Sequence, residues 1–189
     1  MDFSDGKLEL VLGTMFSGKT TYLLNKISIF SELNFKILYA NIEFDNRSEL
    51  KFSTHNLFLN SNESKKNLQM IKTKKLSEID FSNYDIILID EAHFFEDLVD
   101  VVKDLLNKKK YVIVSFLMGD YKGDLFGHAV NLIPLCDEIH RLQAFCTICA
   151  KEKKHRIAIY SKRIFDSEET IDIGGIEKYI PVCRTHYKD

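Results

Sequence analysis

Short runs of Ile, Val and Leu recur along the first two thirds of the chain, without the alternation of polar residues that a half-exposed strand shows. They lie at Leu8–Leu12, Lys36–Ala40, Ile86–Ile89 and Val112–Leu117. Runs of this kind are typical of parallel strands, because both faces of a parallel sheet are covered. The pattern therefore predicts four buried parallel strands.

Helical spacing separates these runs. Apolar residues recur three and four positions apart in Lys19–Ser31 and again in Phe95–Leu106. Alternation of strands with amphipathic helices predicts an α/β fold, in which a parallel sheet has helices on both faces. The segment Asn46–Leu76 is polar and weakly patterned, and we predict a loop there with one short strand near Leu57–Leu59.

The character of the sequence changes after about Leu142. Paired cysteines, a basic run over Lys151–Arg156 and a Gly174-Gly175 turn follow. We predict two domains, with residues 1–142 carrying the sheet and residues 143–189 forming a small, loop-rich unit.

Composition and the pattern of apolar residues limit the kinds of partner and the cellular compartment that we expect. The 189 residues include 26 basic and 28 acidic side chains, and a formal net charge of −2 gives no general attraction to nucleic acid or acidic membranes. The first seven residues are polar and do not read as a signal peptide. Every apolar stretch is also shorter than the roughly 20 residues that a membrane span needs. We predict a cytoplasmic protein with neither nucleic acid nor membrane as a partner.

Residues 13–20 match the phosphate-loop pattern G-x-x-x-x-G-K-[ST] in full. Its glycines let the backbone wrap around an anion, while the following helix directs N–H groups and its positive dipole end at that anion. Lys19 is expected on the β- and γ-phosphates, and the Thr20 hydroxyl on Mg²⁺. The pattern predicts ATP binding by Gly13, Met15, Phe16, Ser17, Gly18, Lys19 and Thr20.

Two carboxylates, Asp90 and Glu91, follow the apolar run Ile86–Ile89. They are expected at the edge of the sheet where ligands bind. Asp90 is then placed to hold Mg²⁺ through water, and Glu91 to accept a proton from the attacking nucleophile. The alternative is a solvated acidic pair at the start of a helix. Residues 90–93 also spell the DEAH sequence of certain helicases, which need two tandem ATPase cores, whereas 189 residues hold one.

Two ligand pairs, Cys146-x-x-Cys149 and Cys183-x-x-His186, have spacings that can grip a metal from a tight turn. Together they predict a structural Zn²⁺ with four ligands and no open position. The alternative is buried free thiols and a surface histidine. The nearby basic run permits a second interpretation of the chain, a zinc-ribbon P-loop ATPase acting on nucleic acid, but interleaved aromatic residues for base stacking are missing. Cys136 is expected in the core.

These motifs together resemble the zinc-containing thymidine kinases of bacteria, poxviruses and animal cytosol, in order and over nearly the whole chain. Asp90-Glu91-x-x-Phe94-Phe95 is similar to the acidic motif of that family. The other matching segments are Gly13–Thr20, Asp45-x-Arg47 with Thr54-His55, Gly119 to Gly127, Asn131–Leu135, Ile173-Gly174-Gly175 with Tyr179, and Cys183-Arg184-x-His186.

The resemblance implies transfer of the γ-phosphate of ATP to the 5′-hydroxyl of thymidine, with deoxyuridine as a possible second substrate and Glu91 as the general base. It implies a small zinc-binding lasso domain that covers the nucleoside, and a homotetramer. It also implies that the nucleoside is bound by Met15, Phe94, Tyr121, Phe126 and Tyr179 around the base and by the lasso backbone at Ile173, Gly174 and Gly175.

Four residues depart from the family pattern, and one of them is Gly123, where some members have Arg. Thr14 stands where Pro is usual, His93 where Gln is common, and Met118 where Asp is common. The last two bear on specificity and turnover, not on the class of reaction. Arg163 is a candidate for the phosphates or a solvated lasso residue. A further alternative, a non-catalytic protein gated by nucleotide, conflicts with the acidic pair at Asp90 and Glu91.

Overall fold

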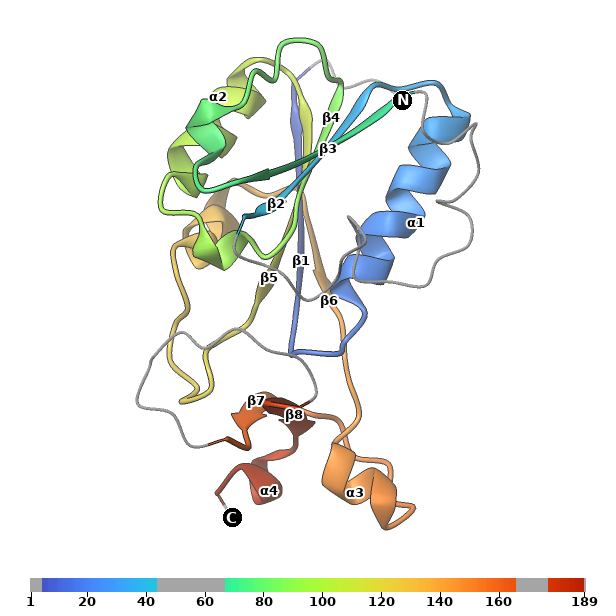
Figure 1. Cartoon of the computed structure of the whole chain (residues 1–189), viewed down its shortest axis with the longest axis vertical. Helices are drawn as coiled ribbons and strands as arrows, with labels where there is room; N and C mark the ends of the chain where they lie inside the picture. The colour runs from blue at the N-terminus through green and yellow to red at the C-terminus, as the bar shows by residue number, and fades with distance from the viewer. Residues whose placement is uncertain (1–4, 44–66, 166–176, 189) are drawn as a thin grey trace.

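The computed structural model describes residues 5–43, 67–165 and 177–188. Six parallel strands form its larger sheet, in the order β3-β2-β4-β5-β1-β6 (Figure 1). The strands are β1 (Lys7–Gly13), β2 (Ile37–Ile42), β3 (Leu68–Thr73), β4 (Ile86–Ile89), β5 (Tyr111–Leu117) and β6 (Glu138–Arg141). The first strand thus lies between β5 and β6, which come later in the chain.

Helices cover both faces of this sheet, which confirms the predicted fold class (Figure 1). Helix α1 (Lys19–Glu32) covers one face. Helix α2 (Leu98–Asn107) covers the other, together with the short 3-10 helices η2 (Leu76–Glu78), η3 (Ala92–Phe94) and η4 (Ala129–Leu135). None of the helices in the described ranges has the length and apolar character that crossing a membrane requires.

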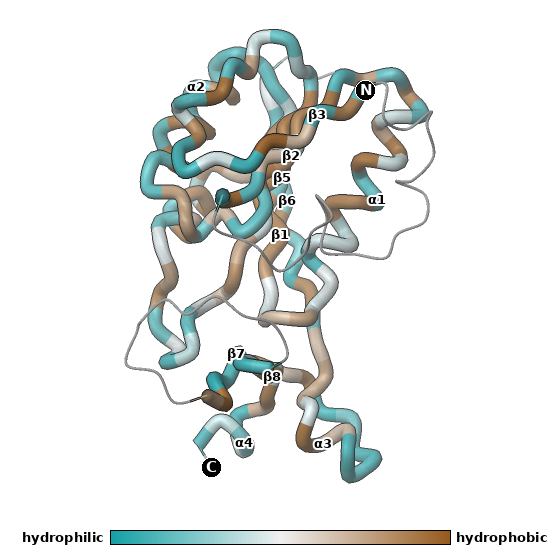
Figure 2. Tube along the Cα trace, viewed as in Figure 1, coloured by the Kyte–Doolittle hydropathy of each residue, from teal (hydrophilic) through white to brown (hydrophobic). Residues whose placement is uncertain are grey.

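Successive residues of the central strands enter two separate cores. Leu10 packs with α2, whereas its neighbour Val11 packs with α1, and Ile87 and Leu88 of β4 divide in the same way. All four side chains are fully buried. Burial of such a side chain contributes roughly 1.5–3 kcal/mol to the stability of the fold. Apolar residues are therefore favoured on both faces of the sheet, which explains the continuous apolar runs in the sequence. Figure 2 shows this as brown strands inside more hydrophilic turns.

The two edge strands were not predicted. The expected loop over Asn46–Leu76 is wrong at its carboxyl end, where β3 pairs with β2. Gln69 and Lys72 of β3 are exposed, and β6 alternates half-buried with exposed residues, because an edge strand faces solvent along part of its surface. The strand expected near Leu57–Leu59 lies outside the described residues.

A smaller unit lies beyond the carboxyl ends of the large sheet (Figure 1). It contains α3 (Thr147–Lys151), an antiparallel pair of strands, β7 (Tyr160–Arg163) and β8 (Tyr179–Val182), and α4 (Arg184–Lys188). Its core is three cysteines with Val182. So small an apolar core suggests that other bonds hold this unit together.

Candidate functional site

The phosphate-loop sequence forms the connection between β1 and α1. Gly18 has φ 88° and Phe16 has φ 61°, and these two left-handed residues turn the chain sharply before the helix begins at Lys19. The buried Lys19 ammonium donates to the carbonyl of Thr14 at 3.0 Å. The loop is therefore wrapped around the lysine that the motif assigns to phosphate.

Two hydroxyls of this loop are buried. Within the described part of the chain, the buried Oγ1 of Thr14 and Oγ of Ser17 have no hydrogen-bond partner. Buried hydroxyls normally find one, because leaving them unpaired costs about 1–3 kcal/mol. Unpaired hydroxyls in a loop of this motif are consistent with phosphate binding, since a bound anion is an acceptor that they lack.

Asp90 follows β4 and is buried beside the loop. Its Oδ2 accepts from Thr20 Oγ1 at 2.9 Å and from Tyr39 Oη at 2.6 Å, while its Oδ1 accepts from Ser115 Oγ and from the Glu91 N–H. Burial raises the pKa of Asp90, the neighbouring Glu91 charge raises it further, and the three hydroxyl donors only partly offset this. A cation would stabilise this carboxylate, and paired oxygens of Thr20 and Asp90 suit Mg²⁺.

Glu91 immediately precedes η3 and has the left-handed conformation, with φ 50°. Such a backbone costs on the order of 1 kcal/mol or more in a residue with a Cβ, and it is often found at functional sites. The Glu91 side chain is 13% exposed, and its Oε2 lies 3.7 Å from Nε2 of His93. Of the two carboxylates, Glu91 is thus the one that a substrate can reach.

The aromatic residues expected around the base form two clusters. Phe94 and Phe126 meet edge to face with ring centroids 5.3 Å apart, and His93 packs against both. Tyr121 and Tyr179 are joined by Arg163, whose guanidinium lies 3.7 Å from the Tyr121 ring centroid and donates to the Tyr179 hydroxyl. The remaining predicted residues Ile173, Gly174 and Gly175 lie outside the described residues, as do Asp45, Arg47, Thr54 and His55.

A cavity of about 130 Å³ separates the loop from the smaller unit. Thr14 of the loop, Met118 and Gly119 after β5, and Tyr160 and Ser161 of β7 line it. Across this gap the Met15 N–H donates to Ser161 Oγ at 2.9 Å, and Tyr187 Oη donates to the Tyr121 carbonyl at 3.1 Å. Both predicted nucleoside contacts, Met15 and Tyr121, are therefore held by the smaller unit.

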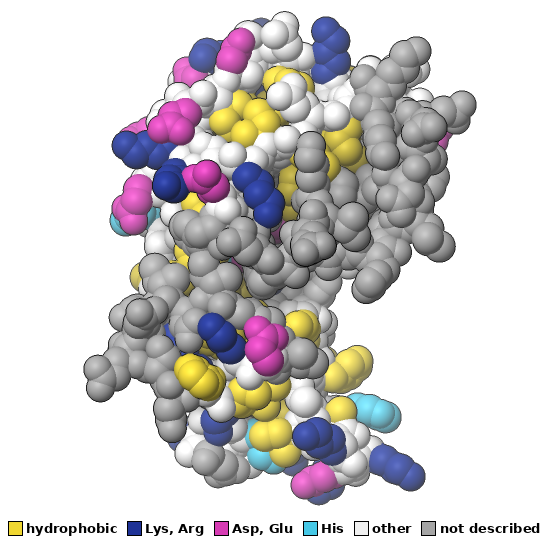
Figure 3. Space-filling model, in the orientation of Figure 1, with side chains coloured by type: hydrophobic (Ala, Val, Ile, Leu, Met, Phe, Trp, Pro, Cys, Tyr) yellow, Lys and Arg dark blue, Asp and Glu magenta, His cyan; other side chains and the backbone are white. Residues whose placement is uncertain are grey.

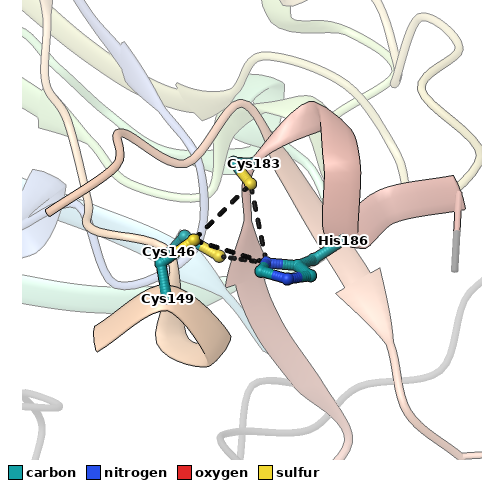
Figure 4. A group of neighbouring side chains, drawn as sticks. All are labelled: Cys146, Cys149, Cys183 and His186. Atoms are coloured by element: carbon teal, nitrogen blue, oxygen red, sulfur yellow. Dashed lines mark hydrogen bonds between the residues drawn. The ribbon is translucent and has the colours of Figure 1, made fainter. Parts of the chain in front are cut away.

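The four predicted zinc ligands converge in that unit (Figure 4). Cys146 and Cys149 come from the start of α3, and Cys183 and His186 from the end of β8 and α4. His186 Nδ1 lies 3.3, 3.4 and 3.6 Å from the three sulfurs, and Sγ of Cys149 lies 3.9 Å from Sγ of Cys183. A tetrahedron with Zn–S of about 2.3 Å and Zn–N of about 2.0 Å has edges of about 3.5–3.8 Å, so these positions fit zinc.

Two of the thiols have opposite pKa shifts, and burial together with the neighbouring thiols raises the pKa of Cys149 to about 11. Burial alone would raise the pKa of Cys146, but hydrogen bonds from the backbone N–H groups of Cys149 and Cys183 and from His186 lower it to about 6. Behind the cluster, Lys162 Nζ donates to the His186 carbonyl at 2.9 Å, which ties β7 to α4. All four cysteines are free of disulfides, and Cys136 is half-buried against the larger core, as expected.

Some contacts could not be found from motifs. Tyr39 and Ser115 hydrogen bond to Asp90, yet each sits within an apolar run and reads there as an ordinary strand residue. A lone polar residue in a fully buried strand is the one signal that could have marked them. Ser161 carries no such signal, because its partner Met15 is 146 positions away.

Comparisons with known proteins agree over almost the whole chain. A family model described as thymidine kinase matches residues 6–187. Thymidine kinase of Fowlpox virus is 36% identical, covering 96% of each chain, and that of Amsacta moorei entomopoxvirus is 38% identical, covering 96% of this chain and 98% of the other. Cytosolic thymidine kinase of Bos taurus is 33% identical, covering 96% of this chain and 72% of its own.

Proposed function

The chain belongs to the thymidine kinase family, and we propose that it transfers the γ-phosphate of ATP to the 5′-hydroxyl of thymidine with Glu91 as the general base. The observation that carries the assignment of residues is the position of Asp90 and Glu91, because the Asp90 carboxylate hydrogen bonds directly to Thr20 of the phosphate loop. An acceptor hydroxyl near Glu91 would then lie beside the bound phosphates.

The two carboxylates have different roles because their surroundings differ. Asp90 is buried among hydrogen bonds from Thr20, Tyr39, Ser115 and the Glu91 N–H, so a substrate hydroxyl cannot reach its carboxylate. Glu91 is partly open and can accept the proton of the attacking hydroxyl. We therefore assign cation binding to Asp90 and proton transfer to Glu91.

The phosphate loop supplies the rest of the charge stabilisation. Its backbone N–H groups, the two buried hydroxyls of Thr14 and Ser17, and the Lys19 ammonium would bind the phosphates of ATP. Thr20 and Asp90 would hold Mg²⁺, which neutralises phosphate charge when bound. Because phosphoryl transfer depends chiefly on positioning and electrostatics, these groups and Glu91 account for the chemistry that the chain must provide.

We further propose that Met15, Phe94, Tyr121, Phe126 and Tyr179 surround the base, with the backbone at Ile173, Gly174 and Gly175 on its polar edge. Zn²⁺ bound by Cys146, Cys149, Cys183 and His186 would hold the unit that carries Tyr179, and residues 1–142 and 143–189 would be the two domains. The family resemblance supports a cytoplasmic homotetramer. The alternative, an ATPase acting on nucleic acid, gains no support from the relatives, which are thymidine kinases.

Glu91→Gln tests the assignment of the base. We expect kcat for thymidine to fall by about 10²–10⁴-fold, since the amide cannot take the proton, while ATP binding by calorimetry persists. Product is identified by mass after incubation with Mg-ATP and thymidine or deoxyuridine, and the same protein is analysed for about one zinc per chain. Glu96→Gln, on an exposed side chain five positions along, is the matched control. A Glu91→Gln enzyme with normal turnover would exclude Glu91 as the base.

A further inference from the structure

The imidazole of His93 lies directly beside the proposed base. His93 is the middle residue of η3, two positions after Glu91, and its side chain is completely covered by protein. Burial of an imidazole is unfavourable unless its nitrogens are paired, so the partners of the ring show what the residue is built to do.

Its hydrogen bonding selects one tautomer. The backbone N–H of Leu117, at the end of β5, donates to His93 Nδ1 at 3.4 Å. A ring nitrogen that accepts a hydrogen bond carries no proton, so in the neutral ring the hydrogen is on Nε2. That nitrogen lies 3.7 Å from Glu91 Oε2, so the Nε2 hydrogen lies near the carboxylate, slightly beyond hydrogen-bond distance.

Packing keeps the ring in this position. The His93 centroid lies 4.2 Å from that of Phe94 and 4.4 Å from that of Phe126. Gly127, with φ 64°, closes over the backbone: a Cβ at that position would lie 2.0 Å from the His93 carbonyl oxygen. The imidazole is thus clamped between two side chains that the proposed function places around the base of the nucleoside.

We propose that His93 is a positioning residue: it orients the Glu91 carboxylate through Nε2–H and fixes that carboxylate relative to Phe94 and Phe126. The inference rests on the proposed function, since it assumes that Glu91 is the base. Its contact with Glu91 is slightly longer than a hydrogen bond, as is common for catalytic groups before substrate is bound. His93 thus contacts the Glu91 carboxylate, the rings of Phe94 and Phe126, and the backbone at the end of β5, and it fixes their relative positions.

Two variants separate orientation from packing. In His93→Gln the amide oxygen can accept from Leu117 and the amide nitrogen can face Glu91, so we expect most of kcat to remain. His93→Leu keeps an apolar body between the phenyl rings but lacks both polar atoms. Because residues that orient a reactive group typically contribute 10–100-fold, we expect kcat to fall by about that factor while KM for ATP is unchanged. His128→Leu, at a half-exposed histidine, is the matched control.

A measurement on the unmodified protein makes the test independent of whether the leucine variant folds. In ¹⁵N spectra of histidine-labelled enzyme, the signals absent from His93→Gln identify His93, and we expect an unprotonated Nδ1 and a protonated Nε2. The inference is overturned if Nδ1 carries the proton, if folded His93→Leu keeps normal kcat, or if both variants are equally slow. A Glu91→Gln enzyme with normal turnover would instead refute the proposed base, so the two failures are distinguishable.

Discussion

Two buried carboxylates on the large sheet each accept several hydrogen bonds, but the groups that donate to them differ in charge. Glu9 of β1 is fully buried and accepts from the hydroxyls of Tyr22 and Tyr111 and from Lys26 Nζ at 2.9 Å. Asp90, after β4, accepts from three hydroxyls and one backbone N–H. One set of donors includes a cation and the other is entirely neutral.

The pKa values respond in opposite directions. Burial raises the pKa of Glu9, but hydrogen bonds from Tyr111, Tyr22 and Lys26, together with the Lys26 charge, outweigh it and leave the pKa lowered. For Asp90, burial and the adjacent Glu91 charge dominate, and the pKa is raised. Glu9 is neutralised within the protein, whereas Asp90 needs charge from outside, which is the property expected of a group that binds a metal.

Among changes to these two carboxylates and their partners, the largest effect should come from Asp90→Asn. We expect kcat to fall by about 10–100-fold, because the variant cannot offer Mg²⁺ a negative oxygen. Without Mg²⁺, the same variant should be more stable than wild type at pH 8. Because folding raises the pKa of Asp90, wild type loses stability as pH rises through that pKa, so the advantage of the variant should shrink as pH falls. Denaturant unfolding at pH 5 and pH 8 measures this, and a less stable Asn variant at pH 8 would contradict it.

Lys26→Met would make Glu9 resemble Asp90 by removing its cation. An uncompensated buried charge typically costs 3–5 kcal/mol; Lys26 is 22% exposed and His140 Nε2 lies 3.4 Å from Glu9, so we expect a loss of about 2 kcal/mol. With the cation gone, the pKa of Glu9 should rise and the deficit should decrease on acidification. Turnover per folded molecule should be unchanged. A deficit that is equal at pH 5 and pH 8 would exclude this electrostatic explanation.

Glu9→Gln should have the smallest effect, about 1 kcal/mol, although it changes the more deeply buried partner. The amide oxygen can accept from one tyrosine hydroxyl and the amide nitrogen can donate to the other, while the released Lys26 can extend into water. Because folding lowers the pKa of Glu9, its contribution is present above the unfolded pKa and is lost as pH falls through the folded value. The deficit, measured by denaturant unfolding, should therefore vanish in strong acid. Because glutamine keeps the shape of glutamate, a Glu9→Gln variant more damaging than Lys26→Met would contradict this ranking and make the negative charge of Glu9 the dominant requirement.

These two carboxylates also show what the sequence could predict. Asp90 was predicted because it lies next to Glu91 at the end of an apolar run, a local pattern with a known chemical use. Glu9 lies inside the run Leu8–Leu12 and attracted no prediction. Its partners are 13, 17 and 102 positions away, on α1 and β5, so only the folded chain brings them together.

The same distinction applies to the strands. The central strands were predicted because burial on two faces imposes an apolar run, whereas β3 and β6 are half-exposed and contain Lys72 and Arg141. The zinc ligands were predicted from two local pairs, but the bond from Met15 to Ser161 depends on how the smaller unit docks. Motifs formed by neighbouring residues could be predicted from the sequence, and contacts between distant elements could not.

The place of β1 between β5 and β6 has a consequence for synthesis on the ribosome. Lys7 pairs with Tyr111, and Glu9 pairs with Glu138, so the strand that leads into the phosphate loop obtains both neighbours only after more than a hundred further residues have been made. Contacts this distant in sequence close slowly and leave apolar strands exposed while they wait. A nascent chain of this kinase would therefore gain its nucleotide site late, and chaperones that shield β1 would have the most time to act.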